Sequence, residues 1–437
     1  MHVDKTTLHD LSIFHHDEEQ SVFHHLNFTQ SNGGREHLRS ILHKPLNSIK
    51  AIKDVQLTIT QLMAVEDHWP YNITNGTVMV VEKFYDTPLE SFPHGSSFIE
   101  SWFYKIMNGP DYSLTKYSVE HFIGFFKGLE QISILLSQPK SIMLQTYLAR
   151  VDMLLKNHNI QEMLRFEKDK KLSPEEVLRF GRFLKNHFDQ KTIELIDIYS
   201  KLDAYLSLAI ACKKYNFNFP DFEETDMPFF EAENLFHVQL TTPVSYNVCL
   251  NNEKNFLFLT GANMGGKSTF IKAMGIGVYL AHLGMGVPAT KMRLSFFDGI
   301  LSNIQVVDNI VKGESFFYNE VQRIKSTVEK ISDGKKWLIL IDELFKGTNQ
   351  QDAVKCSITV IEGLRKMNNA LFVLSTHLYE IGEALKQHKN IQFQYFETSI
   401  IDDQLVFSYQ LKEGISNDRL GYLILKKEGV VDMLNKL

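Results

Sequence analysis

The chain has few cysteines and no excess of positive charge, and both properties narrow what it can be. Its three cysteines, Cys212, Cys249 and Cys356, lie far apart and lack the spacing of a zinc site or a disulfide framework. A reducing cytoplasm is therefore the expected location. The formal net charge of −6 argues against a protein that coats nucleic acid through a generally basic surface, although it leaves room for a local basic face.

Long apolar runs are also missing. No stretch approaches the roughly 20 apolar residues needed to cross a bilayer, and the N-terminus lacks a basic segment followed by an apolar one. We therefore expect neither export nor membrane insertion. The remaining composition, 44% hydrophobic and 22% charged residues, is typical of a soluble globular protein, and 437 residues is the length of two or three domains.

The first half of the chain has a mostly helical pattern. From about Leu8 to Phe230, apolar residues recur at three- and four-residue steps. Ser173, the following proline and Glu176 form a helix start with a capping box, and this helix is predicted to continue to about Lys214. The segment 69–114 predicts loops and short helices. After residue 230, short apolar strands alternate with helices, which predicts a largely parallel sheet and a domain boundary near that point.

The most informative stretch is residues 260–269, Thr-Gly-Ala-Asn-Met-Gly-Gly-Lys-Ser-Thr. An apolar run, 256–259, predicts a buried strand before it, and 270–283 predicts a helix after it. Strand, glycine-rich turn and helix in this order form a P-loop, in which backbone N–H groups and the helix N-terminus surround a phosphate. We expect Lys267 to reach the outer phosphates of ATP and the Ser268 hydroxyl to ligate Mg²⁺. The residues expected to bind the nucleotide are Gly261, Ala262, Asn263, Met264, Gly265, Gly266, Lys267, Ser268 and Thr269.

Polar side chains follow two further predicted strands. The apolar run 337–341 ends in Asp342 and Glu343, at the strand end where α/β sheets bind ligands. Asp342 is expected to hold Mg²⁺ through water, and Glu343 to accept a proton from the water that attacks the γ-phosphate. The run 371–374 leads to His377, a candidate to sense or stabilise the γ-phosphate.

A Gly-Ser element lies between the P-loop and the acidic strand. Gly313 and Ser315 are placed to open a helix whose N-terminus faces a phosphate. ATPases of the ABC class place such an element across a dimer, so that each ATP is closed by the partner subunit. From these residues alone, a plain helix cap is the alternative interpretation.

Together these motifs resemble those of the MutS family, the DNA mismatch-recognition ATPases. The Asn-Met-Gly-Gly of 263–266 is far narrower than the general P-loop pattern. Residues 313–320 resemble the family's signature element, 342–348 its acidic strand and loop, and Thr376-His377 its histidine switch. Residues 414–421 resemble the segment that leads into the C-terminal dimerisation helices.

The resemblance extends into the helical half. Gly33-Gly34-Arg35-x-x-Leu38 resembles the start of the MutS core domain, and 202–220 the helix that returns to the ATPase. Full-length members also carry a mismatch-reading domain with a Phe-x-Glu wedge and a connector, which this chain is expected to lack. The matching letters at Phe98-Ile99-Glu100 are interpreted as chance, and no strand-rich clamp segment is seen before Ser173.

The resemblance implies an α/β ABC-type P-loop ATPase domain at 231–437, with C-terminal dimerisation helices, preceded by a mostly α-helical core and lever domain at 1–230. It implies a homodimer with two composite sites for ATP and Mg²⁺. Lys267, Glu343 and His377 would be catalytic, Ser268 and Asp342 would hold the metal, and Ser315 would serve the partner's ATP. The implied partner is DNA, as branched or otherwise non-B structures rather than single mismatches. The alternative is a nucleotide-switched subunit that docks on a protein or a ribosome and has no DNA site.

Overall fold

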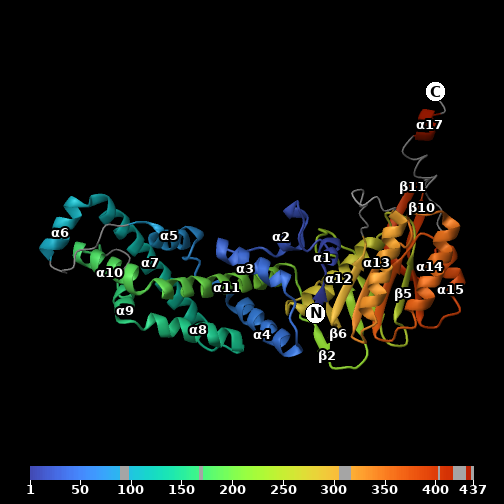
Figure 1. The fold of residues 1–437 in the computed structure, drawn as a ribbon, viewed down its shortest axis with the longest axis horizontal. Coiled ribbons are helices and arrows are strands. Elements are labelled where there is room, and N and C mark those ends of the chain that lie inside the picture. The colour runs from blue at the N-terminus through green and yellow to red at the C-terminus, as the bar shows by residue number, and fades with distance from the viewer. Residues whose placement is uncertain (89–97, 167–170, 305–315, 402–403, 417–429, 435–437) are drawn as a thin grey trace. The chain divides into compact units, whose positions relative to one another are not determined.

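The computed structural model describes residues 1–88, 98–166, 171–304, 316–401, 404–416 and 430–434 (Figure 1). The chain divides into two compact units. A sheet unit contains Met1–His25, Pro45–Ile52 and Tyr215–Leu437, and a helical unit contains Leu26–Lys44 and Lys53–Lys214. The protein is therefore of mixed α/β class, with a helical N-terminal part and a sheet-containing C-terminal part, as expected.

The two structural units differ from the division expected at residue 230 in where they place residues 1–25. These residues belong to the sheet unit, where β1 (His2–Val3) pairs in parallel with β7 (Gly299–Asn303). A two-residue strand is too short to leave a periodic signal in the sequence. The organisation into a core domain at 1–230 and an ATPase domain at 231–437 stays a prediction.

The helical unit is built from α-helices whose ends are marked by capping side chains. Ser173 and Glu176 form the expected capping box at α10. The single helix predicted from there to Lys214 is wrong, because Phe188 has non-helical backbone angles and separates two helices. The helices of this unit are α3 (Asn32–His43), α4 (Ile49–Val65, which begins in the sheet unit), α5 (Asn75–Asp86), α6 (Phe98–Met107), α7 (Gly109–Leu135), α8 (Ile142–Leu155), α9 (His158–Leu164), α10 (Pro174–His187) and α11 (Asp189–Lys214).

Asp203 of α11 anchors the start of α3. Its buried carboxylate accepts hydrogen bonds from the Ser31 N–H at 2.8 Å, the Ser31 hydroxyl at 2.7 Å and the Gln30 N–H at 2.9 Å. A Cβ atom on Gly34 would lie 2.1 Å from Asp203 Oδ2, and one on Gly33 would lie 2.3 Å from the hydroxyl oxygen of residue 200. The two glycines are therefore required for the close approach of α3 to α11.

The larger sheet of the sheet unit has the strand order β1-β7-β8-β9-β5-β10-β11 within the described residues. Its neighbours are parallel except for β10 and β11, which confirms the expected largely parallel sheet. The remaining bounds are β5 (Phe256–Thr260), β8 (Trp337–Asp342), β9 (Ala370–Ser375), β10 (Ile391–Ile401) and β11 (Gln404–Glu413). Because β8, β9 and β5 are adjacent and parallel, their carboxyl ends bring three predicted motifs to one edge.

A smaller sheet and several helices complete this unit. Of the helices in the described ranges, none has both the length and the apolar character that a membrane span requires. The smaller sheet has the order β2-β6-β3-β4. Its strands and the helices of the unit are β2 (Asp221–Glu223), β3 (Phe230–Leu235), β4 (Tyr246–Leu250), β6 (Lys291–Ser295), α1 (Lys5–Asp10), α2 (Val22–Leu26, whose last residue falls in the helical unit), α12 (Lys267–His282), α13 (Phe316–Ile331), α14 (Gln350–Leu364), α15 (Tyr379–Leu385) and α17 (Val430–Leu434).

Candidate nucleotide site

The glycine-rich loop joins β5, whose five residues are all buried, to the N-terminus of α12. Gly261 and Gly266 have φ angles of 130° and 109°, which side chains other than hydrogen rarely allow. A Cβ atom on Gly261 would also lie 3.0 Å from the backbone oxygen of Phe396. The loop thus has the sharp turn and close backbone approach predicted from its sequence. It leads directly into the first turn of α12, whose backbone N–H groups have no carbonyl partner within the helix.

Lys267 folds back over this loop. Its Nζ donates to the carbonyl oxygens of Gly261 at 2.7 Å and Ala262 at 2.9 Å, and the residue is only 5% exposed. Burial lowers the pKa of Lys267, while the nearby charges of Glu343 and Asp342 oppose that shift. Carbonyl oxygens are weaker partners for an ammonium group than charged phosphate oxygens. Lys267 is therefore suited to leave the two carbonyls and bind a phosphate.

Asp342 lies between two hydroxyl groups. The Ser268 hydroxyl donates to Asp342 Oδ2 at 2.5 Å, and the Ser375 hydroxyl donates to Oδ1. Ser375 is paired in register with Asp342 on one side and with Leu259 on the other. A hydroxyl and a carboxylate at the loop fit Mg²⁺, which prefers oxygen ligands and keeps several waters. The described residues contain no cluster of three or more His, Cys, Asp or Glu side chains for a metal, so such an ion would depend on few protein ligands.

Glu343 is held between His377 and Lys346. His377 Nδ1 lies 3.1 Å from one carboxylate oxygen, and Lys346 Nζ lies 3.4 Å from the other. Burial would raise the pKa of Glu343, but the hydrogen bond to His377 and the charges of Lys346, His377 and Lys267 together lower it to about 2. Glu343 also has a φ of 66°, a strained backbone conformation of the kind found at functional sites.

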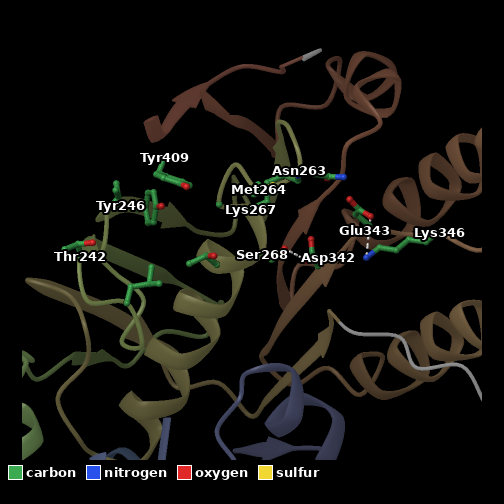
Figure 2. Close-up of a pocket in the computed structure, with 14 residues that line it drawn as sticks. Thr242, Tyr246, Asn263, Met264, Lys267, Ser268, Asp342, Glu343, Lys346 and Tyr409 are labelled. Carbon is green, nitrogen blue, oxygen red and sulfur yellow. Dashed lines mark hydrogen bonds and ion pairs between the residues drawn. The ribbon is translucent and has the colours of Figure 1, made fainter. Parts of the chain in front are cut away.

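These groups open onto a single cavity of about 660 Å³ (Figure 2). Of the predicted nucleotide ligands, Asn263, Met264, Gly266, Lys267, Ser268 and Thr269 line it, together with Asp342 and Glu343. His377 does not line the cavity, but it forms a hydrogen bond with Glu343, which does. Gly261, Ala262 and Gly265 shape the loop without lining the cavity, and Ser315 lies outside the described residues, as do Gly313 and Glu314.

The other wall of the cavity is formed by residues that the sequence patterns do not predict. That wall comes from the segment before β4, the first residue of β4, β11 and the loop after β8, and its residues are Leu240, Thr242, Val244, Tyr246, Tyr409 and Lys346. No motif marks these positions. Tyr246 and Tyr409 lie on strands that are held by the pairing of β3 with β4 and of β10 with β11, and such pairing leaves no local pattern in the sequence. The cavity volume falls within the range of small-molecule sites.

Comparisons with known proteins find similarity to MutS proteins. The family model described as MutS domain V matches residues 257–434. "DNA mismatch repair protein MutS" of Thermotoga maritima is 29% identical over 241 residues, which is 55% of this chain and 30% of that protein. The protein of the same name from Staphylococcus haemolyticus is 28% identical over 241 residues, 54% of this chain and 27% of that protein. The matched region thus spans less than a third of these relatives. On these matches, residues 257–434 are similar to MutS domain V, and over about half of its length the chain is similar to proteins of DNA mismatch repair.

Proposed function

We propose that the chain is a magnesium-dependent ATPase of the ABC type, converting ATP to ADP and phosphate. The observation that carries this proposal is the convergence of three groups on one cavity: Lys267 at the glycine loop, the Ser268–Asp342 pair and the Glu343–His377 pair. Each group is common in proteins. Their arrangement around one glycine-rich loop fits phosphoryl transfer, in which catalysis is mainly positioning and charge stabilisation.

The loop and the first turn of α12 would hold the phosphates. Lys267 would leave the carbonyl oxygens of Gly261 and Ala262 for the outer phosphate oxygens, and Ser268 and Asp342 would hold Mg²⁺. When bound, the ion neutralises charge on the phosphates. The cavity extends beyond this end toward the two aromatic rings of Tyr246 and Tyr409, and this part would receive the nucleoside.

Glu343 would orient and deprotonate the attacking water. The water gives its proton to the carboxylate as its oxygen bonds to the γ-phosphorus and the bond to the bridging oxygen of ADP breaks. A carboxylate with a pKa of about 2 is ionised but is a weak proton acceptor. Negative phosphates nearby, and the movement of Lys267 toward them, would raise this pKa and so strengthen Glu343 as a base.

The proposal extends to a dimer and to DNA. Ser315 would complete the partner's site in a homodimer, and hydrolysis would open and close that dimer. The MutS relatives are named for DNA mismatch repair, so we propose DNA, or a non-standard DNA structure, as the partner of a cytoplasmic protein related to that process. The net charge of −6 favours the second candidate, a nucleotide-switched subunit acting on a protein or ribosomal partner.

Two measurements test the proposal. Phosphate release from ATP should require Mg²⁺. A folded chain that releases no phosphate from ATP when Mg²⁺ is present would reject the ATPase proposal. Binding to duplex, mismatched and branched DNA should be measured at moderate salt and should weaken as salt rises. Intact ATPase activity without binding to any of these DNAs would favour the interaction subunit instead.

A further inference from the structure

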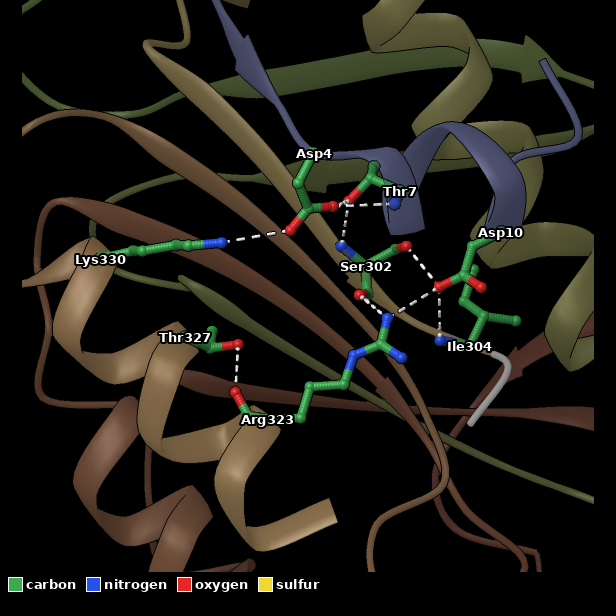
Figure 3. Close-up of polar contacts among 8 residues, drawn as sticks. All are labelled: Asp4, Thr7, Asp10, Ser302, Ile304, Arg323, Thr327 and Lys330. Atoms are coloured by element: carbon green, nitrogen blue, oxygen red, sulfur yellow. Dashed lines mark hydrogen bonds and ion pairs between the residues drawn. The ribbon is translucent and has the colours of Figure 1, made fainter. Parts of the chain in front are cut away.

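The buried carboxylate of Asp10, in α1, has no role in the site described above. It is 0% exposed and accepts hydrogen bonds from the Ser302 hydroxyl at 2.6 Å and the Ile304 N–H at 3.0 Å (Figure 3). Arg323 of α13 lies 3.3 Å from the same oxygen and also donates to the Ser302 carbonyl at 2.7 Å. One carboxylate from the N-terminal segment therefore ties the end of β7 to α13.

The same helix α13 reaches the loop beyond Glu343. One turn before Arg323, Glu320 is 2% exposed and accepts hydrogen bonds from the Lys346 N–H at 3.1 Å and the Gly347 N–H at 3.2 Å. Lys346 in turn forms the ion pair with Glu343. A continuous set of hydrogen bonds and charges thus runs from Asp10 through α13 to the candidate base.

The N-terminal segment also packs on the helix that follows the glycine loop. A Cβ atom on Gly275 of α12 would lie 2.5 Å from the Leu11 side chain, so that the two are in close contact. Burial lowers the pKa of Lys272 on the same helix, and the negative charges of Asp10 and Asp342 oppose that shift. The segment therefore touches the two helices that flank the site.

We infer that Asp10 is a positioning residue for Glu343, acting through Arg323, α13 and Glu320. The inference rests on the proposed ATPase function for its kinetic consequence, but its structural consequence is independent of nucleotide. Loss of the Asp10 charge removes one of the partners that hold Arg323, and we expect this to loosen α13 and the loop that carries Lys346. Glu343 then loses its fixed place while the phosphate-binding groups stay intact.

The test compares Asp10→Asn with Asp17→Asn, the same chemical change at an exposed acid of the N-terminal segment that contacts Gln20. Asp10→Asn should lower kcat by about tenfold or more, since small displacements of catalytic groups carry such costs, and should leave the KM for ATP within about twofold. Asp17→Asn should match the wild type. Adding Glu320→Gln to Asp10→Asn should have less effect than the two single changes multiplied together.

Hydrogen exchange without nucleotide supplies the independent readout. In Asp10→Asn the amides of Lys346 and Gly347 should exchange faster than in wild type, whether or not the chain hydrolyses ATP. Unchanged exchange at these amides would overturn the inference. So would an Asp10→Asn protein that is less stable to heat but has a normal kcat per folded molecule, because Asp10 would then only stabilise the fold. If the wild type releases no phosphate, the ATPase proposal fails and the exchange result alone decides the role of Asp10.

A second inference comes from α6 in the helical unit. Six large apolar side chains of this ten-residue helix are 49–77% exposed, whereas the buried side presents Ser101 and Tyr104. At 100° per residue the exposed side chains cover one half of the helix and the two buried ones lie opposite. The exposed residues are Phe98, Ile99, Trp102, Phe103, Ile106 and Met107.

We propose that this face binds the same face of a second copy of the chain. Six such side chains expose roughly 100 Å² each, so two copies would bury roughly 1,200 Å² in total, the lower bound of a specific stable interface. The charges on α6, Glu100 and Lys105, cancel, so the face lacks the basic excess that favours anionic lipid or nucleic acid. A self-complementary patch is what a twofold dimer requires.

Trp102 reports directly on this contact. It is 49% exposed, whereas the other two tryptophans, Trp69 and Trp337, are 5% and 4% exposed. In the full chain without nucleotide, acrylamide quenching of tryptophan should fall as protein concentration rises, together with a shift to dimer mass. Phe103→Glu should abolish both changes. Ile134→Glu, on an equally exposed residue near the end of α7, should behave as wild type.

Three results overturn the proposal. Trp102 could stay equally quenched at every concentration, or Phe103→Glu could associate as the wild type does. Alternatively, Trp102 could be protected only when neutral phosphatidylcholine vesicles are added, which would assign the face to lipid.

Discussion

His377 Nδ1 lies 3.1 Å from Glu343 Oε1, at the carboxyl ends of two adjacent parallel strands. This contact joins the histidine to the candidate base rather than to the phosphate loop. It is one of the interactions that keep the pKa of Glu343 low, and so it ties the protonation of the base to the presence of the histidine.

His377→Ala should therefore move the acid limit of hydrolysis upward. Without this hydrogen bond, the pKa of Glu343 rises from about 2 toward its usual range, so the carboxylate becomes protonated at a higher pH as the solution is acidified. The pH profile of kcat checks this. His158→Ala, at a mostly exposed histidine of the helical unit, is the control. An acid limit that stays in place would show that His377 does not set the protonation of Glu343.

Lys267→Met should separate ATP binding from stability. The substitution removes the ammonium that would contact the phosphates, so affinity for ATP should fall tenfold or more, or about 1.4 kcal/mol. The free energy of unfolding should stay equal or rise, because burial disfavours the charged form of Lys267. Isothermal titration and urea unfolding measure the two effects, with the exposed Lys291→Met as control. Undiminished ATP affinity would exclude Lys267 from the site.

Gly34→Ala should destabilise the helical unit by about 2–4 kcal/mol, because its methyl group would lie 2.1 Å from a buried Asp203 oxygen. Gly124→Ala, within α7, meets nothing within 4 Å and should stabilise the helix by about 0.5–1 kcal/mol. Urea unfolding followed by circular dichroism compares the two. Equal effects of the two alanines would argue against the close contact of α3 with α11.

Acid should destabilise the sheet unit through His282. This buried imidazole lies 2.8 Å from the Val278 carbonyl and accepts from the Phe297 N–H at 3.0 Å, an arrangement that requires the neutral ring. Burial lowers the pKa of His282 to about 3. As the pH falls below about 6.5, the unfolded state takes up the proton first, and stability should drop by about 1.4 kcal/mol per pH unit until the folded-state pKa is reached.

The buried His237, with a pKa lowered to about 4, should add to this slope. His282→Gln should lower stability at pH 7.5 yet flatten the dependence of the unfolding free energy on pH. A slope that is as steep in His282→Gln as in wild type would contradict a neutral buried His282.

The strands and loops that carry the phosphate-binding and acidic groups could be predicted because each has a strong local pattern. Their convergence depends on the order β8-β9-β5, which places Ser375 between Asp342 and Leu259 and which no local pattern encodes. The helix break at Phe188 was missed because the apolar spacing continues across it. Asp10 was missed because an acid near the N-terminus looks solvated until its partners, almost 300 residues away, are known.

The role of Glu343 as the base is tested most directly by comparing ATP binding and single-turnover hydrolysis in Glu343→Gln and wild type. Glutamine keeps the size of the side chain but cannot accept the proton of the attacking water. Glu343→Gln should bind ATP with Mg²⁺ about as well as wild type and should hydrolyse it about a hundredfold more slowly or slower still. Hydrolysis at the wild-type rate in Glu343→Gln would contradict the assignment of Glu343 as the base.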